Sequence, residues 1–150
     1  MILRNLHTGI TVSNLDRSIE FYRDVVGLTL SRREPPRATR SQKLGVPDAV
    51  VEIAVFEYGE NKDSVELIQY KAPQSPNDYG ATVNALGQIH LAFKVDDIAS
   101  EIRRMKALGV EFIGGDDYGE TLEGPLAGWK WIYFKDPDGA NLEFIEGDLK

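Results

Sequence analysis

Residues 89–98 read IHLAFKVDDI, and residues 6–15 read LHTGITVSNL. The two stretches agree in type and order: an apolar residue, a histidine, an alternating strand-like run and the polar start of a helix. They contain both histidines of the chain, His7 and His90, and each places a small residue, Gly9 or Ala92, on the same strand face as its histidine. A histidine that returns at the same place in two copies of a unit indicates one site assembled from both copies.

A helix is predicted after each of these strands, because apolar residues recur at helical spacing behind a polar capping residue. The apolar positions are Leu15, Ile19, Tyr22 and Val26 in the first copy and Ile98, Ile102, Met105 and Leu108 in the second. Gly27 and Gly109 follow the last apolar positions, where glycine commonly ends a helix. Each copy therefore begins with a strand and an amphipathic helix.

Three further β-rich runs follow each helix. They cover residues 28–30, 49–56 and 64–70 in the first copy and residues 110–113, 129–134 and 141–146 in the second. We expect Pro35-Pro36 to prevent regular strand pairing. We also expect residues 38–44 to form a short helical turn and residues 114–128 an acidic, glycine-containing loop.

The repeat predicts one domain, residues 1–150, made of two β-α-β-β-β modules. The modules are residues 1–72 and 88–150, and a polar linker without periodicity, residues 73–87, joins them. One four-stranded module cannot bury both faces of its sheet, because its helix covers only one of them. We therefore expect an α+β fold in which a curved mixed β-sheet forms a ligand-binding cleft, with the helices on the outside.

Composition and charge exclude several classes of protein. The formal net charge of −7 argues against general nucleic-acid binding and against adhesion to an anionic membrane, since both need a positive surface. The chain has no cysteine, which excludes disulfides, a thiol nucleophile and cysteine-ligated metals. The sequence shows no secretory signal and no apolar stretch long enough to span a bilayer, so we expect a soluble cytoplasmic protein.

Strand alternation brings two carboxylates onto the strand faces that carry the histidines. Glu66 is flanked by Val65 and Leu67, and Glu143 by Leu142 and Phe144. The apolar neighbours should face the helix-side core, so both carboxylates should point the other way, toward the cleft. His7 and His90 also lie opposite the larger apolar residues of their strands. Two imidazoles and two carboxylates are thus expected to converge on one concave face.

This donor set predicts a divalent metal site with His7, Glu66, His90 and Glu143 as ligands. A cation relieves the repulsion among such groups, and nitrogen and oxygen ligands without sulfur suit Ni, Zn, Co, Mn or Fe(II). Four protein ligands on an octahedral ion leave two positions open for substrate. The ion then acts as a Lewis acid that polarises a carbonyl and stabilises an enediolate, while a carboxylate moves the proton.

Two further groups are candidates for substrate binding. Residues 31–47 carry five basic residues against one acidic residue, although the chain as a whole is acidic. We expect Arg37 and Arg40 either to bind an anionic substrate tail, such as a carboxylate or phosphate, or to lie on a solvated surface. Trp131 and Tyr133 share one face of their strand, where they either line the pocket or pack in the core.

The chain resembles the vicinal oxygen chelate superfamily, which includes glyoxalase I, methylmalonyl-CoA epimerase, extradiol dioxygenases, thiol transferases for fosfomycin, and metal-free bleomycin-binding proteins. The resemblance covers nearly the whole chain. It lies in the two histidine stretches, in Val65-Glu66-Leu67, and in Asp136-Pro137-Asp138-Gly139 followed by Leu142-Glu143-Phe144. It implies paired β-α-β-β-β modules, a metal site of the kind described above and a homodimer. The superfamily performs several chemistries on one scaffold, so the resemblance alone does not select the reaction.

Individual members of the superfamily imply different residue roles. The four-ligand pattern resembles glyoxalase I, in which the counterpart of Glu143 also serves as base, although residues 35–48 do not match that enzyme closely. Val50-Val51-Glu52-Ile53 resembles the stretch that bears the catalytic acid of the epimerase, and we expect Glu52 on the cleft face. The epimerase, however, usually has Gln at the position of Glu66. Ring-cleaving dioxygenases have a two-histidine, one-carboxylate site that does not need Glu66.

We therefore expect a homodimeric, divalent-metal-dependent, glyoxalase-like lyase or isomerase that acts on a small oxygenated, anionic substrate through an enolate-type intermediate. Glu143, together with Glu52, is expected to move the proton. One alternative is an Fe(II) extradiol dioxygenase that uses His7, His90 and Glu143. The other is a metal-free drug- or metabolite-binding protein.

Overall fold

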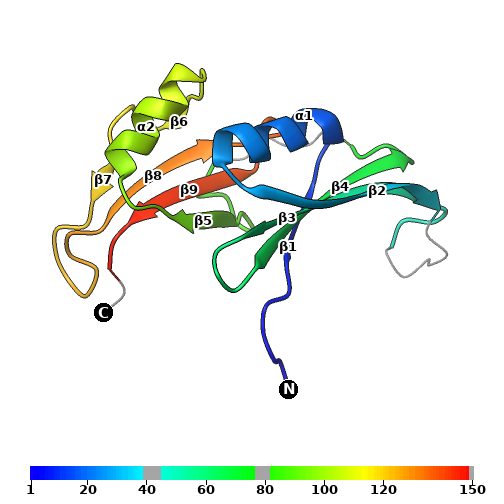
Figure 1. The fold of residues 1–150 in the computed structure, drawn as a ribbon, viewed down its shortest axis with the longest axis horizontal. Helices are drawn as coiled ribbons and strands as arrows, with labels where there is room; N and C mark the ends of the chain where they lie inside the picture. The colour runs from blue at the N-terminus through cyan, green and yellow to red at the C-terminus, as the bar shows by residue number, and fades with distance from the viewer. Residues whose placement is uncertain (39–44, 77–81, 149–150) are drawn as a thin grey trace. The chain divides into compact units, whose positions relative to one another are not determined.

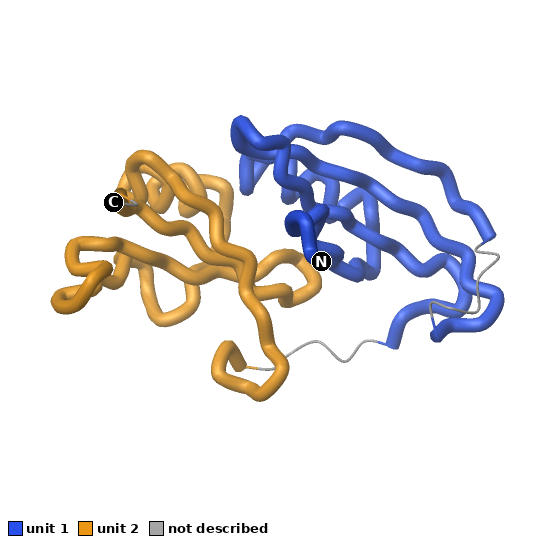
Figure 2. The backbone as a smooth tube through the Cα atoms, turned by 90° about the horizontal axis from the view of Figure 1, so that it is seen from below, with its two compact units in different colours: residues 1–78 blue, residues 79–150 orange. Residues whose placement is uncertain are grey.

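The computed structural model describes residues 1–38, 45–76 and 82–148, and it divides into two compact units. Unit 1 is Met1–Asp78 and unit 2 is Tyr79–Lys150, shown in two colours in Figure 2. The division falls inside the linker predicted at residues 73–87. Each unit therefore corresponds to one copy of the repeat.

Unit 1 is a four-stranded mixed sheet with a helical segment on one face (Figure 1). The strand order is β1-β4-β3-β2, in which β1 runs parallel to β4 and the other neighbours are antiparallel. Its elements are β1 (Thr8–Thr11), α1 (Leu15–Glu20), the π-helix η1 (Phe21–Val26), β2 (Thr29–Ala38), β3 (Val50–Tyr58) and β4 (Asp63–Ala72).

The helical segment of unit 1 begins and ends where the sequence predicts. The Asn14 side chain accepts a hydrogen bond from the Arg17 amide at 3.1 Å, which satisfies one of the free donors of the first turn. Leu15 and Tyr22 are fully buried on the face toward the sheet. The last turns widen into η1, and Gly27 ends the segment in the left-handed conformation with φ 89°.

The second strand of unit 1 is longer than expected. As predicted, Pro35-Pro36 interrupt regular pairing, since neither proline has a partner in the register of β2 with β3. Pairing nevertheless resumes at Arg37, and β2 continues to Ala38. The prolines are tolerated because β2 is the edge strand of its sheet and because its register with β3 shifts between Glu34 and Arg37. Of the helical turn expected at residues 38–44, Ala38 belongs to β2 and the rest lies outside the described residues.

Unit 2 repeats this architecture. The strand order is β5-β9-β8-β6, with β5 parallel to β9 and a short β7 paired to β8. Its elements are β5 (His90–Lys94), α2 (Ile98–Ala107), β6 (Phe112–Ile113), β7 (Gly119–Glu120), β8 (Lys130–Lys135) and β9 (Asn141–Glu146). Asp97 caps α2 through its bond from the Ser100 amide. The loop expected at residues 114–128 contains β7, which the sequence pattern missed.

The same hydrogen bonds tie the helix to the last strand in both units. The Leu15 amide at the start of α1 donates to Gln69 Oε1 at 3.1 Å, and the Ile98 amide at the start of α2 donates to Glu146 Oε2 at 2.8 Å. Gln69 and Glu146 occupy equivalent positions, three residues after Glu66 and Glu143. The internal repeat therefore extends from the sequence to individual hydrogen bonds. The mixed sheets and helices of the two units confirm the predicted α+β class. Among the described residues, no helix has the length and apolar character needed to cross a membrane.

Candidate functional site: two equivalent histidine–glutamate pairs

The first pair, in unit 2, joins the edge strand β5 to its parallel neighbour β9. Ala92 lies opposite Glu143 in the strand register, and His90 is two residues before Ala92 on the same face. His90 Nε2 is 3.1 Å from Glu143 Oε2. The Glu143 side chain is only 7% exposed, whereas the His90 side chain is 49% exposed. A carboxylate is thus held beneath an accessible imidazole.

Tyr133 completes the surroundings of this pair. It lies directly opposite Glu143 in the antiparallel register of β8 and β9, and its hydroxyl donates a hydrogen bond to the Glu143 carboxylate. Its ring meets the His90 ring edge-on, with centroids 5.2 Å apart. Burial raises the pKa of the Glu143 carboxyl above its ordinary value, and the opposing effects of His90 and the Tyr133 hydroxyl do not cancel it.

The second pair, in unit 1, has the same strand register. Gly9 lies opposite Glu66 in the parallel pair β1 and β4, and His7 is two residues before Gly9. His7 Nε2 is 3.8 Å from Glu66 Oε1, and the Glu66 side chain is 18% exposed. A hydrogen bond of 2.9 Å from the Ser64 hydroxyl to the Leu6 carbonyl holds the backbone directly before His7.

The alternation predicted for both carboxylates agrees with the observed burial. The apolar neighbours that flank them are buried almost completely on the helix side: Val65, Leu67, Leu142 and Phe144. Within either unit, the described residues form no cluster of three or more histidine and acidic side chains able to hold a metal ion. Each unit thus supplies two candidate ligands.

The chemistry of the two pairs fits a divalent metal ion. Each pair offers one imidazole nitrogen and one carboxylate oxygen, the donors preferred by Zn, Ni, Co, Mn and Fe(II) when sulfur is absent. Adjacent ligands around an octahedral ion with bonds of about 2.1 Å are about 3 Å apart. The 3.1 Å between His90 Nε2 and Glu143 Oε2 matches this spacing, and the 3.8 Å in the other pair exceeds it by less than 1 Å.

Glu52 does not lie on the strand face where we expected it. It lies opposite Gln69, whose side chain caps α1, so Glu52 is on the helix side of the sheet, the face opposite to that of Glu66. There it is buried and forms ion pairs with Arg33 at 2.6 Å and with Lys71 at 3.0 Å. Burial favours a higher pKa, but the hydrogen bonds and charges of Lys71 and Arg33 outweigh it and lower the pKa of Glu52. The structure thus does not bring Glu52 together with the candidate ligands.

The arginines predicted to bind an anionic tail have protein partners where they are described. Arg37 forms an ion pair with Glu34 at 2.9 Å, and Arg32 pairs with the same carboxylate. Arg33 is held by Glu52 and Asp16. Arg40 lies outside the described residues. The described part of the basic stretch is therefore neutralised by its own acidic neighbours.

Trp131 and Tyr133 lie on the Glu143 face of β8, and the centroids of their rings are 5.9 Å apart.

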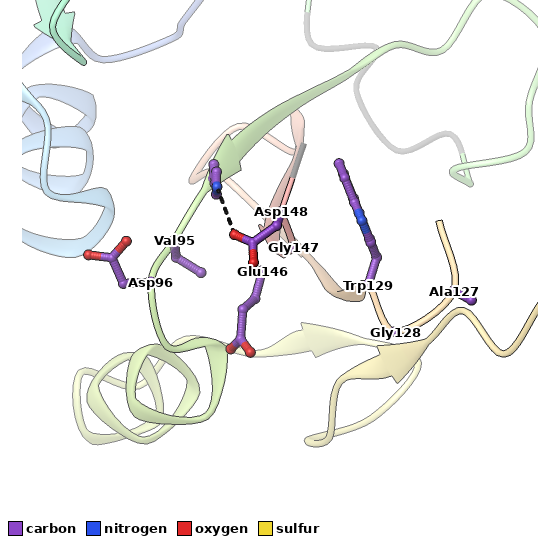
Figure 3. A pocket seen from close by; sticks show the side chains of 9 residues that line it. Val95, Asp96, Ala127, Gly128, Trp129, Glu146, Gly147 and Asp148 are labelled. Atoms are coloured by element: carbon purple, nitrogen blue, oxygen red, sulfur yellow. Dashed lines mark ion pairs between the residues drawn. The ribbon is translucent and has the colours of Figure 1, made fainter. Parts of the chain in front are cut away.

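A pocket of about 400 Å³ lies in unit 2, next to the ends of β5 and β9 (Figure 3). It is lined by Trp129, Lys94, Asp148 and neighbouring residues. Unit 1 has a pocket of about 320 Å³ at the corresponding positions, around Val12, Gln69 and Lys71. The recurrence shows that this hollow is a general feature of the repeated unit.

Comparison with known proteins gives consistent matches over nearly the whole chain. The model of the glyoxalase/bleomycin resistance protein/dioxygenase superfamily matches residues 4–144. A 2-epi-5-epi-valiolone epimerase from Actinomyces is 32% identical, covering 93% of this chain and 76% of the relative. A lactoylglutathione lyase from Neisseria meningitidis is 31% identical, covering 96% of this chain and 91% of the relative. The crystal structure of a glyoxalase family protein from Bacillus cereus is 26% identical with a TM-score of 0.82, covering 98% of this chain and 95% of that one.

Proposed function

The chain belongs to the glyoxalase/bleomycin resistance protein/dioxygenase superfamily, and we propose that it is a divalent-metal-dependent enzyme of the glyoxalase-like lyase or isomerase type. Relatives named as a lyase and as an epimerase favour these two reaction types. The proposed metal ligands are His7, Glu66, His90 and Glu143.

The observation that carries the proposal is the repetition of one arrangement. Each unit places a histidine at the start of its edge strand or directly before it, and a glutamate on the neighbouring parallel strand. The glutamate lies opposite the residue two positions after the histidine. A chance surface pair has no reason to recur with the same register in both copies. A shared function of the two pairs accounts for it, and a metal ion is the partner that this donor set prefers.

The metal ion would supply Lewis acidity to a substrate that binds it through two adjacent oxygens. Glu143 would move a proton next to the substrate carbonyl, because its carboxylate is buried beside the accessible His90 imidazole, where little water competes for the proton. Trp131 and Tyr133, on the same strand face, would shield the reacting atoms from water. Glu52 is left out of this mechanism, because it lies on the opposite face of its sheet and is held by two cations.

The four-ligand set favours this chemistry over a ring-cleaving dioxygenase. A dioxygenase would use His7, His90 and Glu143 and would leave Glu66 without a role. In unit 1, however, Glu66 occupies the position that Glu143 occupies in unit 2, and it lies within 4 Å of His7. The proposed substrate is a small oxygenated molecule with a carbonyl next to a C–H bond.

The proposal is tested by measuring turnover of the methylglyoxal–glutathione hemithioacetal and deuterium exchange from solvent into small hydroxy-ketones and an acyl-CoA. The protein is treated with a chelator and reloaded with Ni, Zn, Co, Mn or Fe(II). We expect metal-dependent turnover or exchange with one of these classes, and a loss of about 100-fold or more in Glu143→Gln. Glu57→Gln, which changes a partly exposed glutamate of β3, is the matched control. Equal exchange with and without metal, or oxygen consumption with a catechol, would contradict the proposal.

A further inference from the structure

The two histidine–glutamate pairs differ at one cross-strand position. Val55 lies opposite Glu66 in unit 1, whereas Tyr133 lies opposite Glu143 in unit 2. The strands, their register and the histidine positions are otherwise equivalent. The difference therefore places a hydroxyl and an aromatic ring beside one pair and only an aliphatic side chain beside the other.

We propose that Tyr133 is a positioning residue that makes the two half-sites unequal: its hydroxyl orients the Glu143 carboxylate and its ring fixes the His90 imidazole. The proposal rests on the metal-dependent function proposed above. The His90–Glu143 pair is then the preformed half of the site, where the proton-moving carboxylate is held in one orientation. The His7–Glu66 pair is the adaptable half, which contributes ligands only.

The geometry of the pairs supports this division. The nitrogen–oxygen separation is 3.1 Å beside Tyr133 and 3.8 Å beside Val55. The Glu143 side chain is 7% exposed and that of Glu66 is 18% exposed. A carboxylate that accepts a hydrogen bond from a half-buried phenol has fewer orientations available than one that faces an isopropyl group. In ligand sites, partners of this kind orient the coordinating group and change metal affinity by about 10-fold to 100-fold.

Tyr133 is itself held by its neighbours. The Trp131 ring lies against the Tyr133 ring, with centroids 5.9 Å apart. Trp131 in turn lies over Gly119, where an added Cβ would come within 2.5 Å of the indole ring. Gly119 belongs to β7, the short strand that pairs with β8. The contact series Gly119, Trp131, Tyr133 therefore gives β7 a role in supporting Glu143.

Tyr133→Phe tests the proposal, because it removes the hydroxyl and keeps the ring. Tyr70→Phe is the matched control, since Tyr70 lies on the Glu66 face of β4 and the same atom is removed. With no metal added, the NMR signals of the two histidines, assigned with His7→Ala and His90→Ala, report each half-site separately. We expect Tyr133→Phe to shift the His90 signals and leave those of His7 in place, and Tyr70→Phe to move neither. Unchanged His90 signals in Tyr133→Phe would overturn the proposal.

The second readout is Co(II) binding. We expect Tyr133→Phe to weaken Co(II) affinity by about 10-fold to 100-fold and to alter the visible spectrum of the bound ion, with Tyr70→Phe unchanged. Wild-type affinity and spectrum in Tyr133→Phe would overturn the positioning role while leaving the metal function intact. A wild-type chain that binds no Co(II) would overturn the metal function, and the metal-free NMR result would still decide the role of Tyr133. Should Tyr133→Phe fail to fold, nuclear Overhauser contacts between the Tyr133 and His90 rings in the wild type are expected, and their absence would overturn the proposal.

Discussion

Glu52 and Glu143 are both buried carboxylates, and their surroundings shift their pKa values in opposite directions. Arg33 and Lys71 hold Glu52 in the charged form, whereas Glu143 has His90 and the Tyr133 hydroxyl as partners, and burial dominates. A carboxylate fixed by two cations is suited to a structural role. One with a raised pKa beside an accessible imidazole is suited to proton transfer. The sequence predicts proton transfer for both residues. Their different charged neighbours instead suit Glu52 to a structural role and leave Glu143 as the candidate for proton transfer.

We predict that Glu52→Gln destabilises the protein by about 1–3 kcal/mol at pH 7, the magnitude expected when buried hydrogen bonds to charged groups are lost. A lowered pKa means that the carboxylate contributes stability above its ordinary pKa of 4.5 and loses it as the pH falls through the lower value of the folded state. Urea unfolding at pH 7 and at pH 3 should show the difference between wild type and variant shrinking at the lower pH. A constant difference would contradict the role of the ion pairs.

Gly147 lies directly against the ring of Trp129. A Cβ added there would come within 2.5 Å of the Trp129 ring, so Gly147→Ala forces the indole to move. We expect a loss of about 1–3 kcal/mol in the free energy of unfolding, together with a change in Trp129 fluorescence in a Trp131→Phe background. Gly9→Ala is the control, because a Cβ at Gly9 would meet only Ile68 Cδ1 at 4.0 Å. Equal effects of the two substitutions would contradict the packing described for Trp129.

The last strand of each unit anchors the first turn of that unit's helix. Glu146 accepts the Ile98 amide with one carboxylate oxygen and the Lys130 ammonium with the other, at 2.8 and 2.6 Å. Gln69 accepts the Leu15 amide and the Lys71 ammonium with its single amide oxygen. The same link is thus made by a charged side chain in one unit and by a neutral one in the other.

This comparison predicts a graded response at position 146. Glu146→Ala removes the acceptor of the Ile98 amide and should lower the free energy of unfolding by about 1 kcal/mol, as expected for a lost helix cap. Glu146→Gln keeps that acceptor, as Gln69 does in unit 1, and should stay closer to the wild type. Urea unfolding followed by circular dichroism measures both. An equal loss in Glu146→Gln would show that the Lys130 ion pair, and not the cap, carries the stabilisation.

The elements predicted correctly from the sequence are those marked by residues close together in the chain. Capping residues, helical spacing and the terminal Gly27 defined the first helix, and the turn at residues 136–139 defined the last hairpin. The path of β2 through Pro35-Pro36 was not predictable from the residues alone, because tolerance of proline depends on an edge position in the sheet. The short β7 was missed because two paired residues carry no periodic pattern.

The candidate site was predictable to a similar extent. Alternation correctly predicted that Glu66 and Glu143 lie on the strand face opposite that of their buried apolar neighbours. It misplaced Glu52, because β3 is a central strand with apolar residues on both faces, so the pattern does not show which face carries the helix. The contact of Tyr133 with Glu143 could be found by counting outward from the 136–139 turn, which pairs Lys135 with Asn141 and hence Tyr133 with Glu143.

Exposed apolar residues also recur at equivalent positions of the two units. Leu6 and Ile89 lie directly before the two histidines and are 63% and 73% exposed. They lead into β1 and β5, the edge strands of the two described sheets. Apolar residues exposed next to a sheet edge are suited to contact with another polypeptide surface.

We propose on this basis that the protein forms a homodimer, and we predict that Leu6→Ser combined with Ile89→Ser weakens self-association. Size-exclusion chromatography with light scattering should give a dimer for the wild type and a larger monomer fraction for the double variant at equal concentration. Leu122→Ser, which replaces an apolar residue 82% exposed elsewhere in unit 2, should leave the dimer intact. A monomeric wild type would contradict the proposal.

We propose that the histidine–glutamate pairs of both units bind one metal ion together. The decisive measurement is the stoichiometry and affinity of Co(II) or Zn(II) binding, compared for the wild type, His7→Ala and His90→Ala. We expect one ion per chain in the wild type and loss of tight binding in each variant, although each variant leaves the other unit's pair intact. Two ions per chain, no ion, or wild-type affinity in either variant would contradict it.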